Sequence, residues 1–536
     1  MEQSLEEMIG QRLMLAFRAK EELSPEIRET IQKFKPGGIT LFRSYNIDNP
    51  QQVRRLTGLF QDAAHKAGLP PLLIAVDQEG GQLMAIGNGT TSLPGNMALG
   101  ATGSVDLSRR SGEVLGRELA AMGINVNYAP CCDVNLNPNN PVIGIRSFGE
   151  DPSLVADLAS EMVTGIQSAG VAATAKHFPG HGDTTRDSHV GLPVIPHSLD
   201  RLRQVEFVPF KSAIRAGTKM VMTAHLALPA IDGSDAPPAT LSSSVLKDLL
   251  REQLGFQGVI ITDAMDMHAI SQGEALGANA VRAAAASADL LLITTDPNDQ
   301  SLIHASLLQA AKDGTLSPKD LNSSAERISS LKEWLMNQRP ESDLDVIGCA
   351  AHRKVADEIA AQSVTLVRDQ AKILPLDLTS GERVAVIIPK PIDLTPADTS
   401  SYETPALASS LRKFHPDVDE FIVSHAPTQQ EIARVLEQIS NYNLIVIGTL
   451  NAFNESHQQE LVHEILRRNI PTIVIAMRLP YDLIAFPETP TYVCTYSILE
   501  PSTKAVASAL FGQSKFQGRL PVSIPDLYPV RYHFEL

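Results

Sequence analysis

The chain has 536 residues, a net charge of −16 and a hydrophobic fraction of 43%. Because a single hydrophobic core stops growing at roughly 250–300 residues, we expect two domains. The acidic balance argues against nucleic acid and against an anionic membrane as partners, since both require a basic surface. No apolar run approaches the roughly 20 residues that span a bilayer.

The cysteines and the N-terminus indicate the compartment. The four cysteines are spaced neither as a disulfide framework nor as a zinc ribbon, so we expect free thiols in a reducing compartment. The first residues are acidic and polar, without the basic segment and apolar core of a signal peptide. We therefore predict a cytoplasmic protein that is a monomer or a weak homo-oligomer.

The first 335 residues repeat one pattern of helix and strand. A capping residue opens each amphipathic helix, a glycine closes it and a short apolar run follows. Helices are predicted over residues 24–35, 49–68, 105–122, 151–170, 198–217, 242–255 and 275–288. Strands are predicted over residues 39–42, 72–76, 124–128, 171–175, 220–224, 259–262 and 289–293. This alternation indicates a parallel sheet covered by helices.

Polar side chains at the strand ends favour a (β/α)8 barrel of the TIM type over a doubly wound open sheet. Each follows the C-terminal end of a different strand: Asp77, Asp133, Lys176-His177, His225 and Asp263. A barrel builds its active site there from several strands at once, whereas an open sheet binds its ligand mainly at one switch point. We therefore predict a catalytic barrel over residues 1–335.

The rest of the chain predicts a smaller second domain. Residues 336–362 are typical of a linker, with Pro340 followed by a polar stretch and a helical segment. An α/β pattern resumes over residues 363–536, with apolar runs at 384–388, 444–447 and 472–476. Few acids or histidines stand beside these strands. We predict an α/β sandwich domain that covers the barrel mouth.

The segment from Lys176 to His189 holds three histidines, two aspartates, a lysine and an arginine within fourteen residues. That density is typical of a catalytic loop. In an extended chain Asp187 and His189 point to the same side, so the carboxylate could orient the imidazole as a general acid and base. The alternatives are a loop salt bridge and a metal site, for which the plausible ligands are His177, His181, Asp183 and His189. Against metal, Pro179-Gly180 breaks the i, i+4 histidine geometry of a zincin-like helix.

Asp263 directly follows the apolar strand predicted over residues 259–262. A carboxylate in that position is costly unless it is paired, so it usually has a role. It could cap a following helix, but Asp266 is a reasonable candidate for that cap. Asp263 is then left as a nucleophile able to attack an anomeric carbon.

Two further signals are weaker. Asp77 and Glu79 precede Gly80-Gly81, and their carboxylates could bind sugar hydroxyls or merely shape a tight turn. Arg146 follows in another loop, where it could bind a hydroxyl or carbonyl oxygen or only brace the loop.

Together these segments resemble glycoside hydrolase family 3, in particular its β-N-acetylhexosaminidase branch. Residues 176–189 fit the branch signature K-H-F-P-G-[HL]-G-x4-D-[ST]-H throughout, and residues 238–242 and 254–263 are similar to the nucleophile region. The segments 35–39 and 76–81 also match. The resemblance implies a nucleophile, an acid/base and an orienting carboxylate, which are Asp263, His189 and Asp187. It implies sugar contacts from Asp77, Arg146, Lys176 and His177.

The implied reaction removes terminal β-linked N-acetylglucosamine with retention, without a metal or organic cofactor. Cell-wall fragments and chito-oligosaccharides are the implied carbohydrate substrates. One departure bears on the sugar: the branch usually continues R-V-x-R after the two glycines, where this chain has Gln82-Leu83-Met84-Ala85. Losing a charged hydrogen bond costs roughly 1.5–3 kcal/mol. Either another residue compensates for the two arginines or the substrate differs.

Other functions stay open at this point. A β-glucosidase would use the same machinery on a different sugar. A phosphorylase is also consistent, because an imidazole acid/base would not repel phosphate as a carboxylate would. A non-catalytic sugar-binding protein would have lost Asp263 or His189, and both are present. A metal-dependent hydrolase would be inhibited by a chelator.

Overall fold

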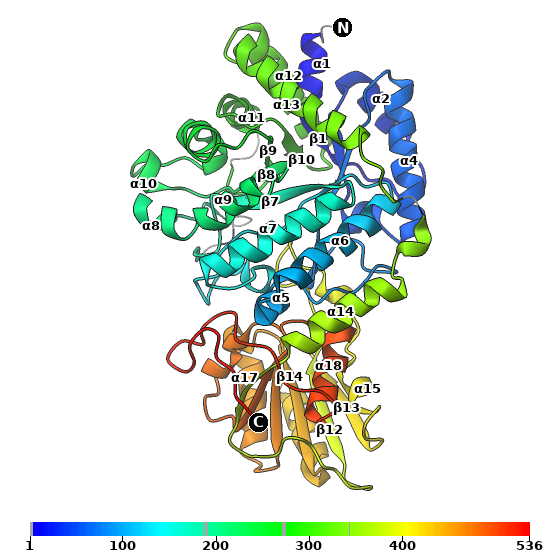
Figure 1. Ribbon diagram of the computed structural model, residues 1–536, viewed down its shortest axis with the longest axis vertical. Helices are drawn as coiled ribbons and strands as arrows, with labels where there is room; N and C mark the ends of the chain where they lie inside the picture. The colour runs from blue at the N-terminus through cyan, green and yellow to red at the C-terminus, as the bar shows by residue number, and fades with distance from the viewer. Residues whose placement is uncertain (1–3, 186, 188–190, 271–274, 342) are drawn as a thin grey trace.

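The computed structural model describes residues 4–185, 187, 191–270, 275–341 and 343–536. Figure 1 shows a barrel in the upper part of the molecule and a second sheet, flanked by helices, below it. Helix α1 (Leu5–Gly10) lies at the far end of the barrel and the C-terminus lies on the lower domain.

Eight parallel strands form the barrel, in the spatial order β10-β1-β2-β3-β6-β7-β8-β9. A parallel bridge between Ile261 and Leu290 joins the two outermost strands. The strands are β1 (Leu13–Leu15), β2 (Gly38–Thr40), β3 (Leu73–Val76), β6 (Val126–Asn127), β7 (Ala172–Phe178), β8 (Met220–Thr223), β9 (Val259–Thr262) and β10 (Leu291–Ile293). The predicted barrel is confirmed, with β1 as a strand that the sequence pattern did not reveal.

Helices follow the strands and cover the outside of the barrel (Figure 1). They are α1 (Leu5–Gly10), α2 (Pro25–Phe34), α3 (Arg43–Asn46), α4 (Pro50–Lys66), α5 (Asn96–Thr102), α6 (Val105–Ala121), α7 (Pro152–Ser168), α8 (Leu199–Gln204), α9 (Phe207–Arg215), α10 (Pro229–Asp232), α11 (Ala275–Ala285), α12 (Pro297–Lys312) and α13 (Pro318–Met336). The single helix predicted over residues 198–217 is two, since Val205 leaves the helical conformation. The helix predicted over 242–255 is a π-helical segment, Ser244–Gln253.

Alternate residues of each strand pack on opposite sides of the sheet, as strand geometry requires. In β8, Met220 and Met222 belong to the cluster inside the barrel, whereas Val221 packs in the larger cluster beneath the helices. The inner cluster also includes Ile328 and Leu331 of α13. Helix α13 therefore closes the end of the barrel at which the strands begin.

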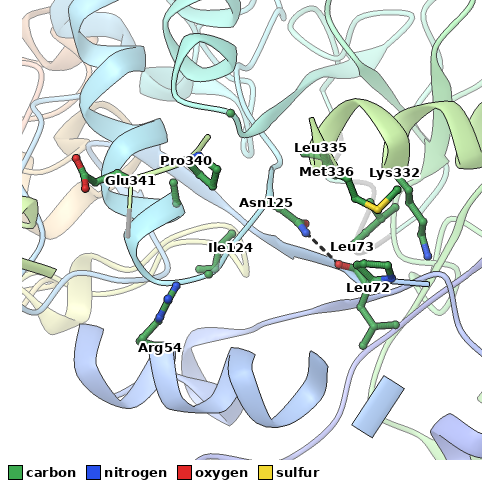
Figure 2. A pocket seen from close by; sticks show the side chains of 14 residues that line it. Arg54, Leu72, Leu73, Ile124, Asn125, Lys332, Leu335, Met336, Pro340 and Glu341 are labelled. Carbon is green, nitrogen blue, oxygen red and sulfur yellow. Dashed lines mark hydrogen bonds between the residues drawn. The ribbon is translucent and has the colours of Figure 1, made fainter. Parts of the chain in front are cut away.

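A cavity of about 320 Å³ opens at this closed end (Figure 2). It lies between the starts of β3 and β6 and the end of α13, and its walls are mostly apolar. Lys332 is buried there and donates to Gln11 Oε1 at 2.7 Å. Burial lowers the pKa of Lys332 to about 7.

The C-terminal domain is built on six strands in the order β11-β16-β15-β14-β12-β13. All pairs are parallel except β11 with β16. The strands are β11 (Thr365–Asp369), β12 (Val384–Pro389), β13 (Val418–Val423), β14 (Leu444–Thr449), β15 (Thr472–Ala476) and β16 (Thr491–Cys494). Its helices are α15 (Leu407–Leu411), α16 (Gln429–Gln438), α17 (Ser456–Leu466) and α18 (Glu500–Leu510), and α14 (Ala350–Ser363), which falls almost wholly in the predicted linker, leads into β11. The predicted α/β character is confirmed.

Buried polar contacts join the two units. Helix α14 lies at the junction (Figure 1), and its His352 shares the buried carboxylate of Glu118 from α6 at 2.9 Å. After α18 the chain returns to the barrel, where Ser523 donates its backbone N–H and its hydroxyl to Glu150 at 2.8 Å. In the described part of the chain, no helix is both long enough and apolar enough to cross a bilayer.

Candidate active site

A cavity of about 660 Å³ lies at the C-terminal ends of the barrel strands. Loops after the strands bring five of the predicted site residues to its wall: Asp77, Arg146, Lys176, His177 and Asp263. The segment 393–402 of the C-terminal domain forms part of the wall on the other side. The fold therefore brings together, in one cavity, predicted residues that are nearly 200 positions apart in the sequence.

Glu79 organises the positive charges of the site. Its Oε1 forms an ion pair with Lys176 Nζ at 2.6 Å and accepts from Arg146 Nη2 at 2.7 Å, and its Oε2 accepts from Arg146 Nε at 3.0 Å. Lys176 also donates to Asp77 Oδ1 at 2.6 Å. The side chains of Glu79 and Lys176 are each 1% exposed, whereas that of Asp77 is 29% exposed. Of the two carboxylates, Asp77 is the one placed to meet a ligand, and Glu79 holds the cations.

The charges of this network stabilise one another. Burial opposes the ionisation of Glu79, but the positive charges of Arg146 and Lys176 outweigh burial and lower the Glu79 pKa to about 2. Burial also disfavours the charged form of Lys176, yet Asp77 and Glu79 raise its pKa above the ordinary value. Glu79 and Lys176 therefore stay ionised near neutral pH.

Asp133 fixes the orientation of the histidine that follows Lys176. Its Oδ2 lies 2.7 Å from His177 Nδ1, and its Oδ1 accepts from the backbone N–H of His181 at 2.7 Å. Although burial opposes its ionisation, His177 and these hydrogen bonds hold the Asp133 pKa well below the usual range. The His177 Nε2 lies 3.4 Å from Arg146 Nη2. Burial lowers the pKa of His181 to about 4, so that imidazole is neutral near pH 7.

Asp263 directly follows β9 and lines the cavity. Its Oδ1 accepts from the backbone N–H of Ala264 at 2.8 Å. Asp266 lines the same cavity and accepts from the Thr294 hydroxyl, in a turn rather than at the start of a helix. The helix cap suggested for Asp266 is therefore wrong, because Asp266 lies in one turn and a second turn follows before residue 271.

The predicted acid/base pair is only partly described. His189 lies outside the described residues. Asp187 is half-buried, its carbonyl accepts from Gly191 N–H at 3.2 Å, and it is not among the described residues that line the cavity. Four residues earlier, Asp183 Oδ2 lies 2.6 Å from His197 Nε2, which ties this loop to the segment before α8.

Two groups of side chains in the described part of the chain have ligand atoms close enough for a metal ion: Cys131, Asp133 and His177, and Asp183, His197 and Glu206. In each group the carboxylates already have protein donors. Asp133 holds His177, as described above. Glu206 accepts from Arg201 Nη1 at 3.0 Å. Both groups therefore form satisfied hydrogen-bond networks, and neither uses the His177 and His181 pairing considered from the sequence.

The segment that departs from the family pattern forms a hairpin over the cavity. Strands β4 (Gln78–Gly80) and β5 (Leu83–Met84) pair antiparallel. Ala85 lines the cavity with a methyl group, while the Gln82 side chain turns to the C-terminal domain and accepts from Arg478 Nη2 at 2.6 Å. A cation is nevertheless present beside Ala85. Arg43, just after β2, donates to Met84 O at 2.8 Å and lines the cavity.

Sequence reasoning did not assign Arg43 or the C-terminal residue Tyr402 to the site. The guanidinium carbon of Arg43 lies 3.8 Å from the centroid of the Tyr402 ring. Neither residue belongs to a dense cluster of charged groups, and 359 positions separate them in the sequence, so only the folded chain reveals the pair. The sequence did point to Asp133, because it follows a predicted strand, but it did not reveal that Asp133 is the partner of His177.

Acidic and basic groups converge at the mouth of the barrel, and a second α/β domain forms part of the cavity wall. These features define a barrel enzyme that acts on a polar ligand. Two matches to known protein families specify the class of enzyme further. Residues 4–331 match the Glycosyl hydrolase family 3 N terminal domain and residues 364–530 match the Glycosyl hydrolase family 3 C-terminal domain. The chain belongs to glycoside hydrolase family 3.

Individual relatives extend over nearly the whole chain. A β-hexosaminidase A of Pseudoalteromonas piscicida is 33% identical, covering 97% of this chain and 96% of its own. A β-N-acetylglucosaminidase/β-glucosidase of Cellulomonas fimi is 31% identical, covering 84% and 83%. The solved family 3 β-N-acetylglucosaminidase from Paenibacillus sp. str. FPU-7 is 37% identical, with a TM-score of 0.92 over 98% of this chain and 99% of that one.

Proposed function

We propose that this chain is a retaining β-N-acetylhexosaminidase that removes terminal β-linked N-acetylglucosamine from oligosaccharides. The observation that carries the proposal is the position of Asp263 at the end of β9, in one cavity with Asp77, Lys176, Arg146 and His177. Relatives named β-hexosaminidase and β-N-acetylglucosaminidase that cover nearly the whole chain support the choice of sugar.

The reaction has two displacement steps at the anomeric carbon. In the first, an Asp263 carboxylate oxygen forms a bond to that carbon while the glycosidic bond breaks, and the leaving oxygen takes a proton from His189. In the second, His189 accepts a proton from water, whose oxygen displaces Asp263 and restores the free carboxylate. Asp187 orients the His189 imidazole in both steps. Two inversions give overall retention of configuration.

The buried network is suited to holding the non-reducing sugar. Asp77 is partly exposed and anchored by Lys176, so its outer oxygen can accept from a sugar hydroxyl. Arg146 and His177 are fixed by Glu79 and Asp133, and they present donors to the same cavity. Side chains already held in place lose little entropy on binding.

The proposed natural substrates are fragments of cell wall or chitin. A second activity, cleavage of β-glucosides, is favoured by two observations. Ala85 brings a methyl group to the cavity wall where the family usually has an arginine, and the Cellulomonas relative is named for both sugars. Phosphate in place of water as the second nucleophile would make the same machinery a phosphorylase.

A rate comparison tests the proposal. The initial rates of an aryl β-N-acetylglucosaminide and the matching aryl β-glucoside are measured with and without phosphate. We expect a clear preference in kcat/KM for the acetamido sugar and no dependence on phosphate. A preference for the glucoside would overturn the choice of sugar, and an absolute phosphate requirement would replace hydrolysis by phosphorolysis.

A further inference from the structure

The hairpin that departs from the family pattern is a docking point for the C-terminal domain. Thr399 donates both its backbone N–H and its hydroxyl to Gln82 O at 2.8 Å, and the hydroxyl accepts from Met84 N at 3.1 Å. Gln82 Nε2 donates to Ala397 O at 3.2 Å. The segment 393–402 of the C-terminal domain is therefore bonded directly to the edge of the barrel cavity.

The same segment is held rigidly from its own side. Arg478 donates to Asp398 Oδ2 at 3.0 Å and to Ser400 Oγ at 2.7 Å, and all three side chains are buried. Asp398 also accepts from the Ser400 backbone N–H at 2.9 Å. Since Arg478 also reaches Gln82, one guanidinium joins the segment to the hairpin. The end of the segment is thereby fixed relative to the barrel.

Tyr402 stands at that end and is open to solvent. It is 54% exposed, one of the large side chains that the described chain leaves exposed, and it lines the cavity. One face of its ring is covered by Arg43, whose Nη1 is held by Met84 O. Arginine stacked on an aromatic ring makes a flat, semi-rigid surface that keeps N–H donors at its edge. Such a surface matches a pyranose ring, which has apolar C–H faces and hydroxyls around its rim.

We propose that Tyr402 and Arg43 form the binding surface for the sugar released as leaving group. Through this pair the C-terminal domain selects oligosaccharides over substrates with a small leaving group. This rests on the proposed function, because it assigns the released sugar to the outer part of the same cavity. The terminal sugar occupies the inner part, beside Asp77 and Asp263. Arg43 also places a guanidinium beside Ala85, where the chain lacks a family arginine.

Two substrates with the same terminal sugar separate this role from catalysis. In N,N′-diacetylchitobiose the leaving group is a second sugar, whereas in N-acetylglucosaminyl fluoride it is one atom and cannot contact Tyr402. We expect Tyr402→Ala to lower kcat/KM for chitobiose roughly five- to tenfold, the size of one aromatic contact. The rate with the fluoride should stay within about twofold. Tyr402→Phe keeps the ring and should restore most of the chitobiose rate.

The controls distinguish recognition from folding. Phe414→Ala removes another exposed aromatic ring of the same domain, one that stacks on Phe511 and does not line the cavity, and should leave the ratio of the two rates unchanged. Equal losses on both substrates with Tyr402→Ala, or no loss on either, would overturn the proposal. If the wild-type enzyme cleaved neither substrate, the proposed function itself would fail.

Discussion

At the scale of single residues, the site depends on one buried carboxylate that the reaction does not consume. Glu79 accepts two hydrogen bonds from Arg146 and forms an ion pair with Lys176, and all three side chains are almost fully buried. Removing one member of a buried ion network leaves an uncompensated buried charge. The resulting loss of folding stability exceeds the net stability that the intact network contributes. Glu79 is therefore expected to matter for stability as well as for the placement of the two cations.

Glu79→Gln should lower the free energy of unfolding by about 3–5 kcal/mol near neutral pH, because the buried Arg146 loses its anion and the buried Lys176 keeps only Asp77. The effect depends on pH. The Glu79 pKa is about 2 in the folded protein and lies at its ordinary 4.5 in the unfolded chain. Its contribution is complete above about pH 4.5 and is lost as the pH falls toward 2. Thermal unfolding of both proteins across pH 3–7 measures this difference.

Glu113→Gln is the matched control for that measurement. Glu113 lies on the surface of α6, with Oε1 3.7 Å from Arg109, and exposed pairs contribute little. The control should unfold within about 0.5 kcal/mol of the wild type at every pH. A Glu79→Gln protein as stable as this control would show that the network is not needed for folding.

The site residues differ in how far the sequence alone could reveal them. Asp77, Lys176, His177 and Asp263 follow apolar runs, and strand ends of a barrel meet at one mouth, so their proximity followed from the pattern. Which of these charged side chains pair with one another could not be predicted. Whether Glu79 meets a sugar or two cations depends on side-chain directions that the sequence does not encode locally.

At the scale of elements, the sequence pattern found seven of the eight barrel strands and the helices between them, but not α12 and α13, which follow the last predicted strand. It missed β1, because Leu13–Leu15 follows a helix of only six residues and the apolar run begins before any turn signal. In the C-terminal domain it missed β11, the four-residue β16 and β13, whose Asp419 and Glu420 are exposed at the edge of the sheet and interrupt the apolar run. Strands that are short or at an edge lack the continuous apolar stretch of a central parallel strand.

Helix α13 provides an element-scale prediction at the closed end of the barrel. Lys332→Met replaces a buried amine that has a pKa of about 7 and whose acceptor in the structure is an amide. Because folding disfavours protonation of this amine, the wild type is penalised below pH 7, and the penalty vanishes as the pH approaches the ordinary value of 10.5. The variant should therefore be more stable at pH 6, on the order of 1–2 kcal/mol.

Denaturant unfolding at pH 6 and pH 9.5 measures that gain, which should shrink at the higher pH. Lys312→Met, an exposed lysine at the end of α12, is the control and should show no gain at either pH. A Lys332→Met protein less stable than the wild type at pH 6 would mean that the bond to Gln11 outweighs the cost of burying the charge.

At the scale of the whole molecule, the two domains contact each other and both line the candidate catalytic cavity. The barrel has two kinds of contact with the rest of the chain: a structural one between Glu118 and His352 of α14, and one at the cavity with the segment 393–402 of the C-terminal domain. The sequence indicated a domain covering the mouth, but not which of its segments would reach the cavity. We propose that the barrel domain ends near residue 335, followed by the linker 336–362.

Truncation after residue 335 tests how far the barrel depends on its partner. The fragment would expose the apolar surface that α14 covers and leave Glu118 without His352, so we expect a lower melting temperature and aggregation on purification. Any soluble fragment should cleave chitobiose more slowly than the full chain. An isolated barrel with full stability and full activity would rule out both the bracing and the recognition role.

The most direct test of the central claim is to identify the residue that carries the glycosyl group. The enzyme is incubated with a 5-fluoro-N-acetylglucosaminyl fluoride, which slows the second displacement, and its peptides are analysed by mass spectrometry. The account predicts one adduct on the peptide that contains Asp263, and none in Asp263→Ala. An adduct on another carboxylate, or inversion of configuration in the first product, would contradict the assignment of Asp263 as the nucleophile.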